Sequence, residues 1–157
     1  MFKTVLRAAA LAAAIVSAPG LAAAVTFGGN WNITQKADTD PGLVVSSSSM
    51  GGVFSTGDLE VGQSHVFNLF RLWTDESSVN GDDTNPQPIK VSFALTSPWG
   101  GSGEITGSTV GHQGPIFDRP QKGVLSWDAP LELGFGKGGK VSIATTDPRS
   151  SPSGRSP

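Results

Sequence analysis

The sequence predicts an all-β protein, an antiparallel β-sandwich of the jelly-roll or immunoglobulin-like kind with about seven to nine short strands. Glycine is abundant, at 21 of 157 residues, and it joins Ser, Thr, Asn, Asp and Pro in turn-like clusters. These clusters recur about every ten residues, the spacing of short strands joined by turns. The segments between them alternate apolar and polar residues or are rich in β-branched and aromatic ones, which favours strands over helices.

The first 24 residues have the layout of a secretory signal peptide. Lys3 and Arg7 precede an Ala-rich apolar stretch, and Pro19-Gly20 separates that stretch from Ala22-Ala23-Ala24, an A-x-A cleavage site. The apolar run is about a dozen residues long, too short for the roughly 20 of a membrane-spanning helix. We therefore expect a signal-peptide helix over residues 1–24, a β-sandwich over residues 25–147 and a disordered tail over residues 148–157.

The first half of the predicted sandwich holds three strands before its most apolar one. Val25–Thr34 is a candidate first strand with a bulge at Gly28-Gly29, because paired glycines interrupt a ladder. Leu43–Ser49 follows a turn at Asp40-Pro41-Gly42, and Gly52–Thr56 continues after a bend.

The middle of the chain predicts the core strands. His65–Trp73 is apolar on both faces and β-rich in composition, as expected of a central strand. In Ile89–Thr96 the odd positions are apolar and the even ones mostly polar, the period of a half-buried strand. Glu104–Val110 is a weaker strand, and Gly111–Lys122 is predicted to be a loop.

Three further strands complete the predicted sandwich. They are Gly123–Trp127, Leu131–Phe135 and Lys140–Thr146. The last two are joined by Gly136-Lys137-Gly138-Gly139, which predicts a hairpin whose glycines supply positive φ.

Charge and cysteine content exclude some classes of function. Cleavage after Ala24 removes Lys3 and Arg7 from the 11 basic residues, which leaves 9 against 13 acidic ones and a formal charge of −4. An acidic domain without a basic patch argues against a nucleic-acid partner. Because the chain has no cysteine, no disulfide supports the fold, and a bound ion remains an alternative source of stability.

Titratable groups for catalysis are few. The chain has two histidines, His65 and His112, and no Tyr or Cys. Neither histidine lies in a metal-ligand spacing, and no G-x-S-x-G motif marks a nucleophile. We therefore expect a non-enzymatic protein with His65 at a strand edge and His112 in a solvated loop.

Two stretches suggest binding instead. The acidic segment from residue 75 to 85 offers Asp75, Glu76, Asp82 and Asp83 as oxygen ligands for calcium, although it lacks EF-hand register and also fits a solvated turn. Four tryptophans raise the alternative of sugar stacking. Trp31 and Trp99, next to polar or Gly-rich residues, are the candidate carbohydrate-binding residues, whereas Trp73 and Trp127 end apolar strands and fit the core.

The segment from residue 110 to 147 carries a resemblance to a known class. It contains G-H-Q-G, W-D-A-P-L and F-G-K-G-G before the last strand, and in these features it resembles bacterial exported proteins of the PEP-CTERM class, particularly those with a V-P-L-P-A sorting signal. The resemblance implies a surface or exopolysaccharide-associated protein of the bacterial matrix, and it transfers no catalytic residue.

The chain departs from that class after Asp147. Members continue with a Pro-containing motif, an apolar helix and a basic cluster, whereas this chain continues with PRSSPSGRSP. A soluble member with a disordered tail, a truncation and a change of reading frame all fit, and the abrupt change of composition favours the last. The expected protein is a secreted structural or adhesive sandwich, with a carbohydrate-binding module as the alternative, an extracellular polysaccharide as partner and calcium as the one ion considered.

Overall fold

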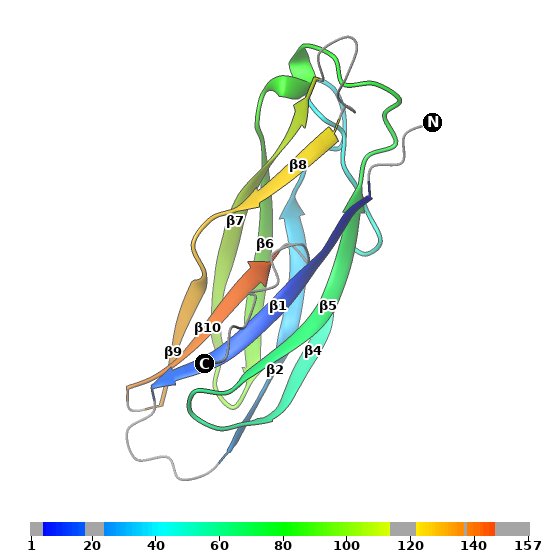
Figure 1. Ribbon diagram of the computed structural model, residues 1–157. Coiled ribbons are helices and arrows are strands. Elements are labelled where there is room, and N and C mark those ends of the chain that lie inside the picture. Colours follow the sequence, from blue (N-terminus) through cyan, green and yellow to red (C-terminus); the bar gives the residue numbers. More distant parts are fainter. Residues whose placement is uncertain (1–4, 18–23, 114–121, 137, 147–157) are drawn as a thin grey trace, which may run out of the picture.

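The sandwich consists of two five-stranded antiparallel sheets. The computed structural model describes residues 5–17, 24–113, 122–136 and 138–146. One sheet has the order β3-β5-β1-β10-β9 and the other the order β4-β2-β6-β7-β8 (Figure 1). The strands are β1 (Val5–Ser17), β2 (Val25–Gln35), β3 (Ser46–Ser47), β4 (Gly51–Leu59), β5 (Ser64–Trp73), β6 (Gln87–Ser97), β7 (Gly101–His112), β8 (Lys122–Trp127), β9 (Leu131–Phe135) and β10 (Gly139–Thr146), and the 3-10 turn η1 spans Asp82–Thr84. The predicted fold class is confirmed.

Strand β6 organises the second sheet. It pairs with β2 on one side and β7 on the other, with Phe93 opposite Trp31 and Gly103. Its alternate residues Ile89, Val91, Phe93 and Leu95 are all buried, as the sequence alternation predicted. In β2 the predicted irregularity is present: the register shifts between Gly28 and Gly29 against β6, and between Thr26 and Gly28 against β4.

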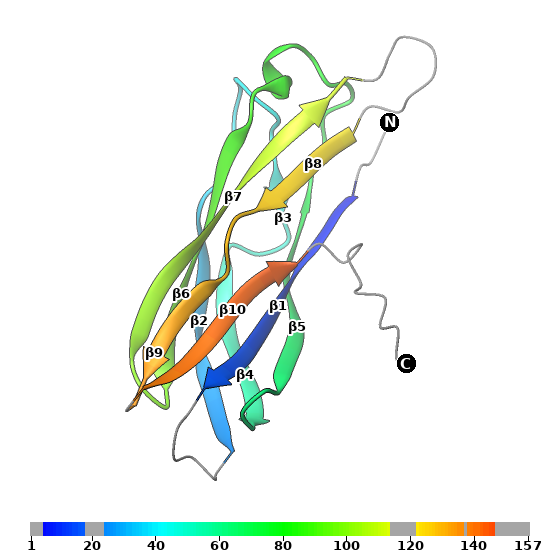
Figure 2. The same ribbon diagram turned by 60° about the vertical axis from the view of Figure 1, so that its left-hand side comes forward.

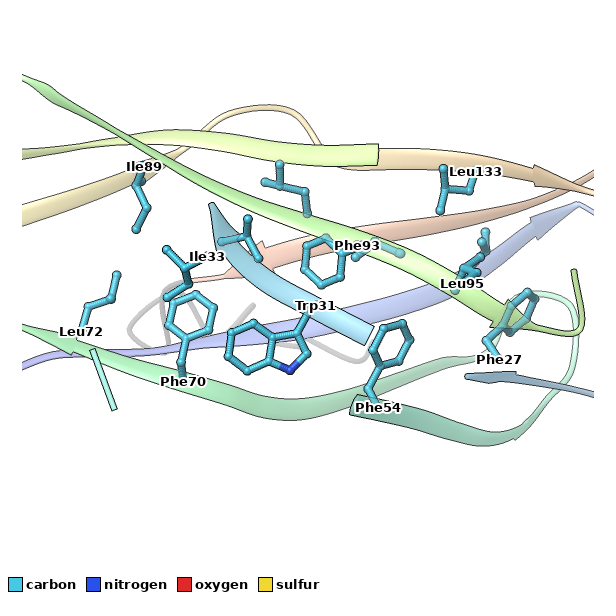
Figure 3. Packing of buried hydrophobic residues seen from close by; sticks show 14 of the residues in the cluster. Phe27, Trp31, Ile33, Phe54, Phe70, Leu72, Ile89, Phe93, Leu95 and Leu133 are labelled. Atoms are coloured by element: carbon cyan, nitrogen blue, oxygen red, sulfur yellow. The ribbon is translucent and has the colours of Figure 1, made fainter. Parts of the chain in front are cut away.

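The core lies between the two sheets and is rich in aromatic rings. Phe27 packs edge-on against Phe135 at 5.2 Å between ring centroids, and Trp31 packs against Phe70 at 5.1 Å. Figure 3 shows Trp31 between Phe70 and Phe54, inside the cluster. Burial of these large side chains supplies the main favourable term for a domain that has no cysteine.

The expectation of a signal-peptide helix is wrong for this structure. Val5–Ser17 forms β1, a central strand that pairs antiparallel with β5 and with β10; Ala12, for example, lies opposite Val66 and Ala144. The physical reason is that an extended segment here satisfies the backbone groups of two neighbouring strands at once, and no local pattern in the sequence encodes this pairing. Among the described residues no helix is long and apolar enough to span a bilayer.

The predicted strand over residues 43–49 is largely a loop. Leu43 and Val45 are buried as a strand pattern would require, but only Ser46–Ser47 pairs as β3. The amide of Val45 instead donates to the carbonyl of Ala37, 2.8 Å away. The apolar pattern therefore predicted the burial of this segment correctly, but most of its backbone lies in a loop and not in a sheet.

The C-terminal strands cross from one sheet to the other. β8 pairs with β7, and after Trp127 the chain continues into β9, which pairs with β10 in the opposite sheet (Figure 2). The predicted glycine hairpin between β9 and β10 is present, with Gly136 at φ 54° and Gly138 at φ 87°. The predicted tail, residues 148–157, lies outside the described residues, as does most of the predicted loop after residue 113.

Candidate functional site

Three carboxylates from separate segments meet at the η1 end of the sandwich. Asp40 lies in the loop after β2, Glu76 in the loop after β5, and Asp83 in η1. One carboxylate oxygen from each lies within 4.8 Å of the others. We call these three residues the carboxylate cluster.

Backbone amides hold two of the three side chains in place. The amide of Val44 donates to Glu76 Oε1 at 2.6 Å, and the amide of Asn80 donates to Asp83 Oδ2 at 2.7 Å. Donors fixed in the backbone orient a carboxylate without rotamer freedom of their own. The cluster is therefore built into the loops and does not depend on flexible partners.

The 3-10 turn η1, which carries Asp83, packs tightly against β7. Asp83 is fully buried under β7, where Gly111 approaches it closely. A Cβ at Gly111 would lie 3.0 Å from Asp83 Cβ and 2.7 Å from Val79 Cγ1. The absence of a side chain at Gly111 thus allows η1 to sit against the strand.

Among the described residues, no ion pair neutralises the negative charge of the cluster. The two ion pairs found among the described residues are Lys36–Asp38 and Lys140–Glu132, and neither includes a cluster member. Burial raises the pKa of Glu76, and the neighbouring carboxylates of Asp83 and Asp40 raise it further, against the lowering effect of the Val44 amide. The site therefore disfavours three bare negative charges.

An open hollow of about 540 Å³ leads from solvent to the cluster. Asp40 and Glu76 are among its lining residues, together with Asp75, Ser77, Ser78 and Asn80. Because all its lining residues except Val44 carry hydroxyl, amide or carboxylate groups, the hollow suits water and small hydrophilic ligands.

The predicted calcium residues divide into two pairs. Glu76 and Asp83 belong to the cluster, whereas Asp75 and Asp82 do not. Asp75 accepts a hydrogen bond from Trp73 Nε1 at 3.1 Å, and Asp82 accepts one from the amide of Gly42 at 3.1 Å.

Asp40, the third member of the cluster, was not among the calcium ligands predicted from the sequence. The Asp40-Pro41-Gly42 stretch predicted a turn. That prediction concerns the backbone conformation and gave no indication that the Asp40 carboxylate would join the cluster.

The structure separates the two candidate sugar-binding tryptophans. Trp31 is only 4 % exposed and packs against Phe70, so its ring face is not free to stack on a pyranose, and the prediction for it is wrong. The cause is its inward position on β2, which its polar sequence neighbours Asn30 and Asn32 concealed because they face the other way.

Trp99 is 43 % exposed in the turn between β6 and β7. It stacks on Phe135 with ring centroids 5.4 Å apart and an interplanar angle of 22°. A core residue therefore fixes the orientation of an exposed indole. The turn between β6 and β7 lies at the end of the sandwich opposite the start of β6, which follows η1 (Figure 1). Trp99 retains the geometry of a stacking platform.

A second candidate contact surface lies along β4, an outer strand of its sheet. Residues 51–57 of this strand, GGVFSTG, carry no charge, and Val53 is 86 % exposed. An open hollow of about 390 Å³ lies beside it, lined by Trp31, Phe54 and Phe67 together with Asn68 and several small residues. We call residues 51–57 the β4 edge.

The remaining predicted residues behave as simple surface groups. His65 is exposed near the start of β5, with its ring 5.4 Å from that of Phe67, and His112 is exposed at the end of β7. No protein-family model, curated protein or solved structure matches this chain.

Proposed function

We propose that the chain is a secreted, non-enzymatic β-sandwich that acts as a structural or adhesive module in the extracellular matrix or envelope of a bacterium, in association with exopolysaccharide. The observation that supports it is the uncharged β4 edge with its exposed Val53. An outer strand without Lys, Pro or inward charge is an available surface for strand pairing or apolar contact. The resemblance of residues 110–147 to exported matrix proteins supports the same setting.

The test is adhesion with an altered edge. Val53→Lys places one positive charge on the β4 edge at a side chain that is mostly in solvent, so the fold should remain intact. We expect this variant to lose most of its retention on a matrix-coated surface or in self-association measured by sedimentation. Val61→Lys is the matched control, because Val61 is 50 % exposed outside the strand. Equal behaviour of the two variants and the parent would refute the adhesive role of the edge.

A second candidate function is a carbohydrate-binding module, favoured by the preorganised indole of Trp99 on Phe135. Affinity electrophoresis in neutral and acidic polysaccharides would measure it, with Trp99→Ala as the variant. Loss of retardation in Trp99→Ala with an unchanged circular dichroism spectrum would support sugar stacking. Retardation that is absent in every polysaccharide, or unchanged in the variant, would reject it.

A further inference from the structure

We propose that Asp40, Glu76 and Asp83 bind one calcium ion at the η1 end of the sandwich. The proposal is independent of the adhesive function, because the cluster and the β4 edge share no residue. Oxygen ligands on opposite sides of Ca²⁺ stand about 4.6–5.2 Å apart, twice a Ca–O distance of about 2.3–2.6 Å. The three oxygens of the cluster lie within 4.8 Å of one another, a spacing that fits ligands around a single ion.

The strongest support is the condition of Asp83. Its side chain is fully buried, its Oδ2 accepts the amide of Asn80, and its Oδ1 has no hydrogen-bond partner. A buried carboxylate oxygen without a donor is costly in free energy. A cation between Asp83 and the other two carboxylates would provide the missing partner and offset their mutual repulsion.

The surroundings favour calcium over a transition metal or magnesium. All three side chains offer hard oxygen ligands, and the cluster contains no imidazole or thiolate. Calcium takes six to eight oxygens in flexible geometry, as a general rule, and the open hollow that Asp40 and Glu76 line admits water to complete such a shell. Magnesium demands near-octahedral geometry and retains its waters more strongly.

The ligand set also explains the arrangement of the loops. The amides of Val44 and Asn80 each donate to one oxygen of Glu76 and Asp83 respectively, and Oδ1 of Asp83 has no hydrogen-bond partner and can ligate the ion. Asp75 and Asp82 have their own partners in Trp73 and Gly42. These two are therefore the acidic residues of the segment that the proposal leaves out.

The experiment uses the full chain, stripped with EDTA and dialysed, and titrated with CaCl2 and separately with MgCl2 by calorimetry. We expect one Ca²⁺ per chain, with a dissociation constant on the order of 10⁻⁴–10⁻³ M, the range of extracellular modules. Glu76→Gln should weaken binding at least about tenfold, as should Asp40→Asn. Asp75→Asn is the matched control, since it removes a charge from the same hollow but outside the cluster, and its effect should stay below about threefold.

Thermal unfolding supplies a second readout that a purely structural role would not reproduce. In EDTA, Glu76→Gln should be as stable as the parent or more stable, because one repelling charge is gone. In millimolar CaCl2 the parent midpoint should rise and the variant midpoint should not. Asp83→Asn should behave in the same way, and Asp40→Asn, at an exposed position, carries the test if the buried variant does not fold.

Four results would overturn the proposal. The first is that CaCl2 produces neither heat in calorimetry nor a shift of the unfolding midpoint, and the second is that MgCl2 at the same concentration raises the midpoint equally. The third is that Asp75→Asn weakens calcium binding as much as Glu76→Gln does. The fourth is that Glu76→Gln is destabilised equally with and without calcium. None of them bears on adhesion by Val53→Lys, so the two proposals fail separately.

Discussion

Replacement of Trp31 by alanine should strongly destabilise the fold, although Trp31 lies among polar residues in the sequence. Its indole is 4 % exposed and packs on Phe70. A tryptophan buries about 150–250 Å², which at about 25 cal/mol/Å² corresponds to roughly 4–6 kcal/mol before the area that alanine retains is subtracted. We therefore expect a loss of about 3–5 kcal/mol, the range for Trp→Ala in cores.

The assay is thermal and urea unfolding followed by far-ultraviolet circular dichroism, because loss of a tryptophan alters the fluorescence signal itself. The expected loss lowers the midpoint by roughly 6–20 °C for a chain of this size. Trp99→Ala is the matched control, since Trp99 is 43 % exposed and its stack on Phe135 accounts for only about 0.5–1.5 kcal/mol. A Trp31→Ala variant no less stable than Trp99→Ala would refute the assignment of Trp31 to the core.

Three further outcomes are expected. Gly111→Ala should lower the free energy of unfolding in urea by about 1–3 kcal/mol, because its Cβ would meet Val79 and Asp83. Gly100→Ala is the control and should lower it far less, because its Cβ would have no atom within 4 Å. Equal losses would contradict the close packing of η1 on β7. In EDTA the free energy of unfolding should fall as pH rises from the ordinary glutamate pKa to the raised pKa of Glu76, because in this window the folded chain binds the proton more tightly than the unfolded chain. Glu76→Gln should flatten this slope, even though Asp40 and Asp83 still face the site. If the proposal of a secreted protein is right, mass spectrometry of the protein in the medium should find a chain that begins at Val25. That chain, having lost the strand between β5 and β10, should associate more readily in sedimentation than the full chain. A protein in the medium that retains Val5–Ser17 would contradict the predicted cleavage.

The local sequence pattern was sufficient to predict a strand where one face of the strand is buried and the other faces solvent. The alternation in Ile89–Thr96 predicted β6 to within two residues at the start and one at the end, and the paired glycines of β2 predicted the bulge. The pattern was insufficient to predict a strand whose pairing strands are distant in the sequence. The Ala-rich stretch that forms β1 carries no alternation, so its conformation is decided by β5 and β10, whose positions the sequence order does not state.

The candidate site shows the same division. Glu76 and Asp83 stand in one acidic stretch, so composition alone singled them out. Asp40 comes from a loop 36 residues before Glu76 and joins them only after β4 and β5 have returned the chain to the same end of the sandwich. Burial was equally hidden: a run of acidic residues resembles a solvated turn, and nothing in it marks Asp83 as the one that lies wholly inside.

A calcium ion at this cluster would stabilise the loops of this chain as a disulfide stabilises the loops of many exported domains. The chain has no cysteine. Its loop after β2 is joined to the loop after β5 by the hydrogen bond from the Val44 amide to Glu76, and to η1 by the one from the Gly42 amide to Asp82. An ion shared by three segments would close the same loops in the folded state alone, and it would therefore stabilise the fold in proportion to its free concentration. Without the ion, the repulsion between Glu76 and Asp83 would loosen the η1 end first, while the aromatic core around Phe93 would remain packed. Amide exchange measured with and without calcium should thus differ at η1 and its loops and stay the same in β6.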